Sequence, residues 1–124
     1  MRSKSIIENC RKRIASHINA LPSEIIFTSG GTEADNLVLR SAVKDLKVTH
    51  LITSKIEHHA VLHTVEQLVI DYRVKVSYVN VLETGCIDYS HLETLLKSTK
   101  KTLVSLMHIN NEIGTILDIQ KVAT

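Results

Sequence analysis

Apolar residues follow two different spacings along the chain, and the two kinds of stretch alternate. Stretches with apolar positions three and four residues apart predict amphipathic helices, and short β-branched runs predict strands. The expected helices cover residues 3–19, 32–47, 57–69 and 89–97, with a further helix opening near Asp118, and the expected strands cover residues 25–28, 49–54, 74–79 and 102–107. In the first helix, one face carries Ile6, Ile7, Cys10, Ile14 and Ile18.

This alternation of strands and helices predicts the fold class. Helices of ten or more residues between strands form right-handed βαβ units, so we expect an α/β fold with a mainly parallel sheet and flanking helices. No Pro/Ser-rich linker divides the 124 residues, and no repeat is present, so one domain is expected. Ligands of such sheets bind beyond the carboxyl ends of the strands. Three polar junctions follow strands, at residues 29–32, 54–59 and 108–114, and one crevice can take groups from all three.

The first junction, Ser29-Gly30-Gly31-Thr32, predicts an anion-binding turn. Two glycines allow a tight turn that presents backbone N–H groups, and Thr32 stands where an N-cap hydroxyl would. The unpaired N–H groups and the dipole of the following helix favour a phosphate or a carboxylate. The stretch is neither a P-loop nor a dinucleotide fingerprint. On this stretch alone, the alternative is a glycine-rich turn that is capped by Thr32 and binds nothing.

The other two junctions carry imidazole and amide side chains. His58 and His59, between a strand and a helix, suit stacking on a planar ring or proton transfer near neutral pH. The alternative is a histidine at a helix start that faces solvent. Asn110 and Asn111 suit the orientation of a ring hydroxyl or a carboxylate, and the alternative is a loop that satisfies its own turns.

Metal sites and carboxylate pairs have less support in the sequence. His59 and His63 are four residues apart and could share a helix face, but no third ligand stands at a supporting spacing, so no metal site is expected. Two carboxylate pairs can be considered for acid–base chemistry, Glu33 with Asp35 and Glu57 with Glu112. The simpler interpretation of Glu33 is an acidic residue in the first turn of a helix, where the helix dipole favours negative charge.

Composition narrows the possible partners. A net charge of +2, one Phe and three Tyr argue against a nucleic-acid partner, and Arg11-Lys12-Arg13 is expected to be a solvated helix face. No apolar run is long enough to span a membrane, and no signal-peptide pattern is present. Cys10 and Cys86 are isolated cysteines without metal spacing, which favours a reducing, cytoplasmic location.

The three junctions together resemble the motifs of cysteine desulfurases, pyridoxal-phosphate enzymes of the aspartate-aminotransferase fold. The matching stretches are Ile26-Phe27-Thr28-Ser29-Gly30-Gly31-Thr32-Glu33-Ala34-Asp35-Asn36, Glu57-His58-His59-Ala60-Val61-Leu62, Gly85-Cys86-Ile87-Asp88 and Met107-His108-Ile109-Asn110-Asn111-Glu112-Ile113-Gly114. They extend over residues 23–118 in the order and spacing of the family. The Asn-Asn-Glu-Ile-Gly form resembles the group that serves general iron–sulfur cluster assembly, whereas the group that includes selenocysteine lyases differs there.

The resemblance implies roles for four residues. Gly31 and Thr32 match the positions whose backbone and hydroxyl hold the phosphate of pyridoxal 5′-phosphate. His58 matches the histidine that stacks over the pyridine ring and takes part in proton transfers, so it is the expected catalytic residue. Asn111 matches the asparagine that hydrogen-bonds on the side of the cofactor's phenolic oxygen. A phosphate anchor, a stacked ring and an orienting amide together form a rigid seat.

The resemblance also implies groups that these residues do not supply. The family's Schiff-base lysine, pyridinium-pairing aspartate and sulfur-accepting cysteine follow the Asn-Asn-Glu-Ile-Gly motif. Neither Lys55 nor Lys121 matches that lysine, and neither Cys10 nor Cys86 matches that cysteine. We therefore expect residues 1–124 to be one incomplete domain, an interior fragment of the cofactor-binding large domain, and to be inactive alone.

For the complete enzyme, the resemblance implies a homodimer that takes sulfur from L-cysteine and leaves alanine and an enzyme persulfide. The sulfur would pass to an iron–sulfur scaffold or another acceptor protein, with no nucleic acid and no membrane as partner. Two alternatives remain open. The chain could act as a non-catalytic phosphate-binding or dimer-interaction fragment, or as an unrelated α/β domain that binds a nucleotide at the same turn.

Overall fold

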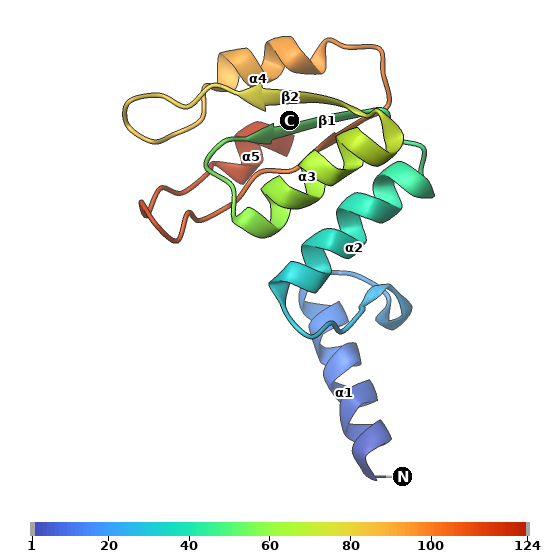
Figure 1. Ribbon diagram of the computed structural model, residues 1–124. Helices are drawn as coiled ribbons and strands as arrows, with labels where there is room; N and C mark the ends of the chain where they lie inside the picture. The colour runs from blue at the N-terminus through green and yellow to red at the C-terminus, as the bar shows by residue number, and fades with distance from the viewer. Residues whose placement is uncertain (1, 124) are drawn as a thin grey trace.

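A computed structural model describes residues 2–123 as an α/β layer structure with one helix standing apart from it (Figure 1). The elements in chain order are α1 (Arg2–His17), η1 (Pro22–Glu24), α2 (Gly31–Lys44), β1 (His50–Ser54), α3 (His59–Tyr72), β2 (Lys75–Val79), α4 (Tyr89–Leu96), β3 (Thr102–Val104) and α5 (Ile119–Ala123). From α2 onward, helices and strands alternate as the apolar spacing predicts. The expected α/β fold class is confirmed.

Three parallel strands form the sheet, in the order β2-β1-β3. β1 is central, because His50 pairs with Lys75 of β2 and with Thr102 of β3. All three strands therefore begin at one edge of the sheet and end at the opposite edge. In Figure 1 the arrowheads point to the left, where the loop after β1 and the loop after β3 lie close to each other.

Helices cover both faces of the sheet and bury β1 completely. Leu51 faces the layer formed by α2 and α3, and Ile52 faces the layer that contains α4. The first core cluster comprises Leu39, Ala42, Val43, Val48, Leu51, Val61, Val65, Leu68 and Val74, and the second comprises Ile52, Val79, Ile87 and Leu92. Full burial of one Leu or Ile side chain contributes about 1.5–3 kcal/mol. The two layers thus fix the positions from which the functional loops depart.

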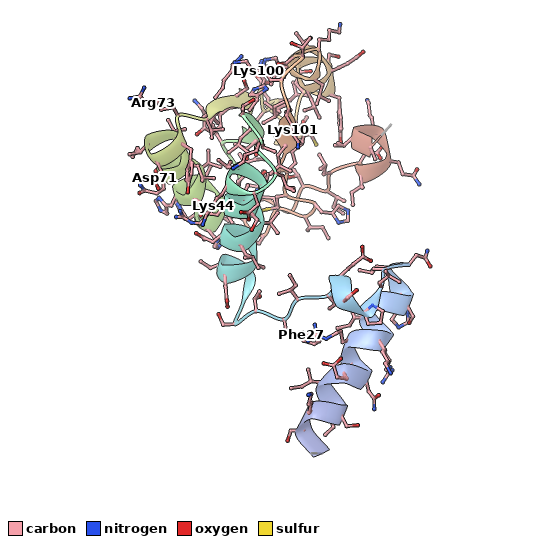
Figure 2. All side chains as sticks on the ribbon, turned by 90° about the vertical axis from the view of Figure 1, so that its right-hand side faces the viewer. Phe27, Lys44, Asp71, Arg73, Lys100 and Lys101 are labelled. Carbon is pink, nitrogen blue, oxygen red and sulfur yellow. The ribbon has the colours of Figure 1, made fainter. Side chains whose placement is uncertain are left out.

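Residues 25–28 form no strand, so the prediction of a first strand there is wrong. None of the three strands pairs with this segment. Ile26 is 68% exposed and Phe27 is 47% exposed, and Figure 2 shows Phe27 far from the sheet, near α1. β-Branched and aromatic residues favour an extended backbone, but a strand also needs a partner to bond with.

α1 is helical as predicted, but its apolar face is not buried. Ile6, Ile7, Cys10, Ile14 and Ile18 are all exposed. Its main neighbour is η1, and Arg11 donates a hydrogen bond to the carbonyl oxygen of Ile25. The helix projects away from the layers that contain the sheet (Figure 1), so the periodicity predicted the helix but not a partner for it.

The remaining boundaries shift for identifiable reasons. α3 begins at His59 because His58 is its N-cap. β3 ends at Val104, earlier than expected, because the chain beyond it turns to contact Glu57 through the N–H of Met107. The short helix expected near Asp118 is present as α5, and the carboxylate of Asp118 accepts a hydrogen bond from the N–H of Lys121. None of the described helices is long and apolar enough to cross a membrane.

Candidate functional site

The first junction forms the N-terminus of α2. Gly30 is the N-cap and has no side chain with which to cap the helix, and Gly31 and Thr32 are the first two helical residues. The prediction that Thr32 is the N-cap is therefore wrong, because the helix begins before it. The N–H groups of the first turn have no carbonyl partner within the helix, so they present donors and the positive end of the dipole to the outside.

The space beside the two glycines is open. A Cβ added to Gly30 or Gly31 would meet no atom within 4 Å. The φ of Gly30, 169°, is ordinary extended backbone. Neither crowding by the described residues nor a left-handed conformation therefore requires glycine here. The pair leaves room for an outside group to approach the backbone closely, as a phosphate does at a helix N-terminus.

Side chains on both sides of the glycines hold the turn in place. Glu33 accepts a hydrogen bond from the N–H of Ser29 at 2.6 Å, and the hydroxyl of Thr28 donates to the carbonyl oxygen of Gly30 at 3.0 Å. Hydrogen bonding by Ser29 lowers the pKa of Glu33 below its usual value. The carboxylate of Glu33 thus serves the turn itself.

His58 is the N-cap of α3, and its ring is exposed. The Nδ1 atom accepts a hydrogen bond from the N–H of Ala60 at 3.1 Å. A nitrogen that accepts carries no proton in the neutral ring, so the proton is then on Nε2. Nε2 is therefore the atom that His58 can offer to a ligand.

An open cleft of about 500 Å³ between α2 and α3 brings Thr32 and His58 together. The rest of its lining comprises Asn36, Arg40, His59, Ala60, His63, Thr64 and Gln67. The rings of His59 and His63 are stacked, with 5.5 Å between their centres. Asn111 is not part of this lining, and its side chain is exposed. The structure thus joins two of the four expected site residues in one cleft, with Gly31 adjoining Thr32 in sequence.

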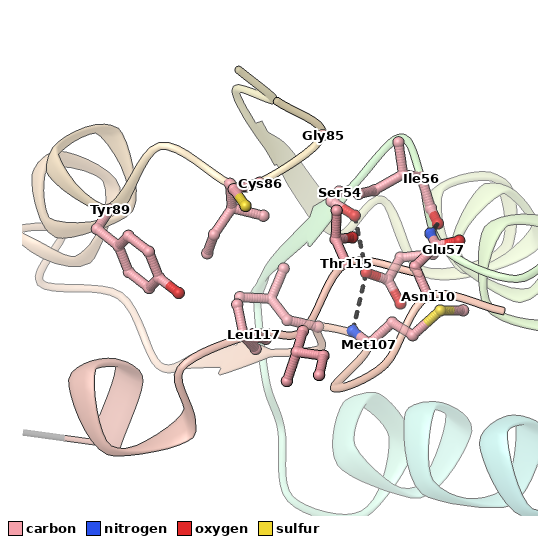
Figure 3. A pocket seen from close by; sticks show the side chains of 13 residues that line it. Ser54, Ile56, Glu57, Gly85, Cys86, Tyr89, Met107, Asn110, Thr115 and Leu117 are labelled. Carbon is pink, nitrogen blue, oxygen red and sulfur yellow. Dashed lines mark hydrogen bonds between the residues drawn. The ribbon is translucent and has the colours of Figure 1, made fainter. Parts of the chain in front are cut away.

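Glu57 connects the loop before His58 to the chain after β3. Its Oε1 atom accepts hydrogen bonds from the hydroxyl of Ser54 at 2.7 Å and from the N–H of Met107 at 3.0 Å (Figure 3). Burial raises the pKa of Glu57, and the nearby charge of Asp35 acts in the same direction. Glu57 is therefore a buried structural carboxyl group, and the structure assigns it to Ser54 and Met107 in place of a pairing with exposed Glu112.

Asn110 forms the second connection between the same two loops. Its side-chain amide donates to the carbonyl oxygen of Ile56 at 2.9 Å, and its Oδ1 accepts from the N–H groups of Glu112 and Ile113. The side chain is buried, unlike that of Asn111. Asn110 therefore holds the loop of residues 108–114 against the residues that precede His58. We call the contacts of Glu57 and Asn110 the loop clamp.

Sequence reasoning missed the loop clamp. It considered Asn110 only as a group that orients a ligand or that satisfies the turns of its own loop, and Glu57 only as one half of a carboxylate pair. A signal for Glu57 was present, since an acidic residue three positions after Ser54, at the end of a buried strand, needs a hydrogen-bond donor. No sequence signal identified Met107 as that donor, because the contact joins positions 50 residues apart.

The turn at Gly85 packs against the clamped loop. Gly85 has a φ of +79°, and a Cβ added there would lie 2.8 Å from Cδ1 of Ile113. Beside it, Cys86 and Tyr89 help to line a small space of about 20 Å³ that also reaches Glu57 and Asn110 (Figure 3). This space is large enough for about one water molecule. It is therefore part of the packing that supports the loops, and the open cleft is the place for a larger ligand.

No group of three or more His, Cys, Asp or Glu side chains lies close enough to hold a metal ion within residues 2–123. In the cleft, His63 has Glu66 as its neighbour, with 3.6 Å between Nδ1 and Oε2. His59 stacks on His63 as described above. Both imidazoles are exposed on one face of α3.

Comparison with known proteins agrees with the fold. A relative, the cysteine desulfurase IscS of Pseudomonas fluorescens (strain Pf0-1), is 45% identical over 120 residues, which are 95% of this chain and 29% of the relative. A solved NifS-like protein superposes with a TM-score of 0.88 at 35% identity, over 98% of this chain and 34% of that one. The solved structure of SspA in complex with cysteine superposes with a TM-score of 0.83 at 35% identity, over 98% of this chain and 35% of that one.

The chain thus spans less than a third of the length of the curated relative. The sequence profile described as Aminotransferase class-V matches residues 1–124, the whole of the chain. The parallel sheet, the helix N-terminus at the two glycines and the histidine at the start of α3 all lie within that match. The chain belongs to the class-V aminotransferase family.

Proposed function

We propose that this chain supplies the phosphate anchor and the ring-stacking side of the cofactor site in a pyridoxal-phosphate-dependent cysteine desulfurase. The observation that carries the proposal is the cleft that brings Thr32, at the N-terminus of α2, together with His58. The names of the relatives support the reaction, and the cysteine complex of SspA supports L-cysteine as the substrate. Alanine and an enzyme persulfide would be the products, and iron–sulfur cluster assembly the use of the sulfur.

The donor set at α2 fits a phosphate group. A phosphate dianion needs several hydrogen-bond donors and positive potential, and a helix N-terminus supplies both. Here the N-cap side chain does not compete for the donors, because Gly30 has none. The open space at Gly31 admits the group to the backbone. We assign backbone donation to Gly31 and hydroxyl donation to Thr32.

His58 has the chemistry for the ring side of the site. The hydrogen bond from Ala60 to Nδ1 fixes the ring orientation and leaves Nε2 to hold or move a proton. When bound, the cofactor ring withdraws electrons from the α-carbon of the amino acid. We therefore assign to His58 both stacking on that ring and proton transfer.

Asn111 is proposed to orient the cofactor from the third junction. Its neighbour Asn110 is bonded to Ile56, two residues before His58. The loop clamp thus sets the distance between the residues around Asn111 and those around His58. The amide of Asn111 itself is exposed and is available for a ligand.

We further propose that residues 1–124 are part of a larger cofactor-binding domain, as found in dimeric enzymes of this fold. Covalent attachment of the cofactor and acceptance of sulfur fall to residues outside the motifs present here, since Lys55, Lys121, Cys10 and Cys86 do not match those positions. A sulfur-acceptor or scaffold protein is then the macromolecular partner. Cys10 and Cys86 are free thiols, in keeping with a cytoplasmic location.

Pyridoxine 5′-phosphate tests the seat directly, because it has the ring and the phosphate but no aldehyde that could react with surface lysines. We expect the chain to bind it with a change in the fluorescence of the pyridine ring. The double variant Thr32→Ala, His58→Ala should weaken binding by roughly tenfold or more, since each removed polar contact contributes about 0.5–1.5 kcal/mol.

The matched control is the double variant Thr99→Ala, His17→Ala, which removes the same two residue types at exposed positions away from the cleft. Equal loss of binding in both variants, or no binding by the parent chain, would overturn the proposed seat. Binding of inorganic phosphate as tightly as of the full ligand would instead favour the alternative of a simple phosphate-binding fragment.

A further inference from the structure

The amino edge of the sheet, where the strands begin, gathers most of the basic loop residues of the chain. Each of the three helix-to-strand connections returns to this edge, because β1, β2 and β3 are parallel. The connections comprise residues 44–49, 70–75 and 96–101. Figure 2 looks onto this edge and shows Lys44, Arg73, Lys100 and Lys101 around it. We call these residues and their neighbours the basic edge.

Charge at the basic edge is strongly unbalanced. Its cationic residues are Lys44, Lys47, Arg73, Lys75, Lys97, Lys100 and Lys101, and its acidic residues are Asp45 and Asp71. All seven cationic side chains are exposed. In the described residues, none of the seven takes part in an ion pair with a carboxylate. The molecule as a whole has a net charge of only +2, so this concentration of charge is local.

Helix ends account for only part of this charge. Lys47 donates from Nζ to the carbonyl oxygen of Lys44, which satisfies one free carbonyl at the end of α2. Arg73 is the C-cap of α3, and cations are favoured beside the negative end of a helix dipole. Each helix end carries roughly half a negative charge, so three ends offset between one and two of the seven cations. Asp45 and Asp71 offset two more, and the positive charge that remains forms no ion pair within the described part of the chain.

The field of this edge extends into the sheet. Burial lowers the pKa of His50, and the ammonium groups of Lys75 and Lys100 lower it further. These two lysines come from different connections, so their charges act together at the centre of the edge. A cleft of about 280 Å³ lined by Lys44, Lys47, Thr49, Tyr72 and Arg73 opens next to them.

We propose that the basic edge is a docking surface for an acidic polypeptide segment. The cations are spread over three connections, and the starts of β2 and β3 lie roughly 10 Å apart because β1 lies between them. An extended peptide places every second side chain about 7 Å apart on one face, so carboxylates at alternate positions can reach successive connections. A compact anion fits less well, because it is too small to contact cations on all three connections at once.

A peptide of alternating Glu and Ser residues, labelled with fluorescein, tests this surface by fluorescence anisotropy at low salt. We expect binding that weakens as salt is raised. The triple variant Arg73→Gln, Lys100→Gln, Lys101→Gln should weaken binding about tenfold, because the loss of each exposed charge weakens it about two- to threefold. The test needs no cofactor, so its result is independent of the proposed cofactor seat.

The matched control is Lys4→Gln, Lys12→Gln, Arg13→Gln, which removes three exposed charges from α1. It should change binding less than twofold, and circular dichroism should show both variants folded as the parent. Equal loss in the two variants would show that only net charge matters and would overturn the proposal. So would tighter binding of a single-stranded oligonucleotide of equal charge, or displacement of the peptide by inorganic pyrophosphate at equal charge concentration.

Discussion

Glu57 is a buried carboxyl group directly before the histidine proposed to handle protons. Its two hydrogen-bond donors, the hydroxyl of Ser54 and the N–H of Met107, come from segments far apart in the sequence. The neutral carboxyl can accept both bonds without the cost of a buried charge. Glu57 therefore connects two loops, and its protonation state affects how strongly these loops are held together.

Replacing Glu57 with glutamine tests this connection through the pH dependence of the free energy of unfolding. Because the folded-state pKa is raised above the usual 4.5, the stabilising effect of the neutral group is complete below pH 4.5 and is lost as the pH rises through the folded-state pKa. Glu57→Gln stays neutral, so its free energy of unfolding should rise relative to the parent as the pH increases. Urea titrations at a series of pH values, from about pH 4 to about pH 7.5, measure this difference in the free energy of unfolding.

Glu57→Ala provides the contrast, because it leaves both donors unpaired and should cost about 1–3 kcal/mol below pH 4.5, where the carboxyl group of the parent is neutral. Parallel stability curves for Glu57→Gln and the parent would contradict the assignment of a raised pKa.

His50 has the opposite pH dependence at the other end of β1. Its ring is held between the hydroxyls of Ser77 and Thr102, at 2.8 and 3.2 Å, and burial lowers its pKa below 6.5. The stabilising effect of the neutral ring is therefore present above pH 6.5 and is lost as the pH falls through the folded-state pKa. In a series of thermal melts, His50→Gln should flatten this loss, and His17→Gln, at an exposed position, should not.

Among the site residues, the sequence correctly placed Thr32 and His58 near helix starts, although Thr32 is not the N-cap that it predicted. Thr32 and His58 stand at helix starts after polar junctions, as their local sequence predicts. The sequence could not show that α2 and α3 face each other across one cleft, because that depends on packing between distant segments. For the same reason it did not predict the contact of Asn110 with Ile56, which is 54 residues away.

Local hydrogen bonds determine where the helices begin and end. A strand, in addition, forms only where a neighbouring strand is available to pair with it. Asp88 is the N-cap of α4, and its Oδ1 accepts a hydrogen bond from the N–H of His91 at 3.1 Å. The Gly-x-Ile-Asp motif, at Gly85 to Asp88, is thus a turn followed by a helix cap. Residues 25–28, by contrast, have strand composition but no strand beside them, and they stay unpaired.

Removing the N-cap of α4 should destabilise the fold. The variant and its control each remove one carboxylate, so the two differ only in the loss of the cap. Asp88→Ala should cost about 1 kcal/mol, because the first turn of the helix loses its side-chain acceptor. Glu93→Ala removes a carboxylate from the same helix at an exposed position and should cost less than half as much. Chemical unfolding of both variants measures the difference, and equal losses would argue against the cap.

At the scale of the whole molecule, two of the places where apolar surface is exposed bear on association. The first is α1 with the segment after it, including Ile18, Leu21 and Ile26, which are 63%, 64% and 68% exposed. The second is the free edge of β3, next to exposed Val38 on α2. Parallel sheets are normally covered on both sides, and free strand edges favour association.

A polypeptide of these 124 residues should therefore associate and have only marginal stability when made alone, and it should release no alanine from L-cysteine. Sedimentation velocity, thermal unfolding and an alanine assay with added pyridoxal phosphate measure the three properties. A monomer with a sharp cooperative unfolding transition would contradict the expectation that the exposed apolar surface causes association. Sustained alanine production would show that a lysine within these residues can serve the reaction.

The sequence alone determined the alternation of helices and strands, because that depends on the spacing of apolar residues along a short stretch. It also determined the polar junctions and, through their order, the family. The tertiary structure decided which junctions meet, which carboxyl group is buried and where the positive charge gathers. These depend on contacts between residues 50 or more positions apart, such as Met107 with Glu57 and Asn110 with Ile56. Such contacts arise only when the parallel strands bring their ends to a common edge.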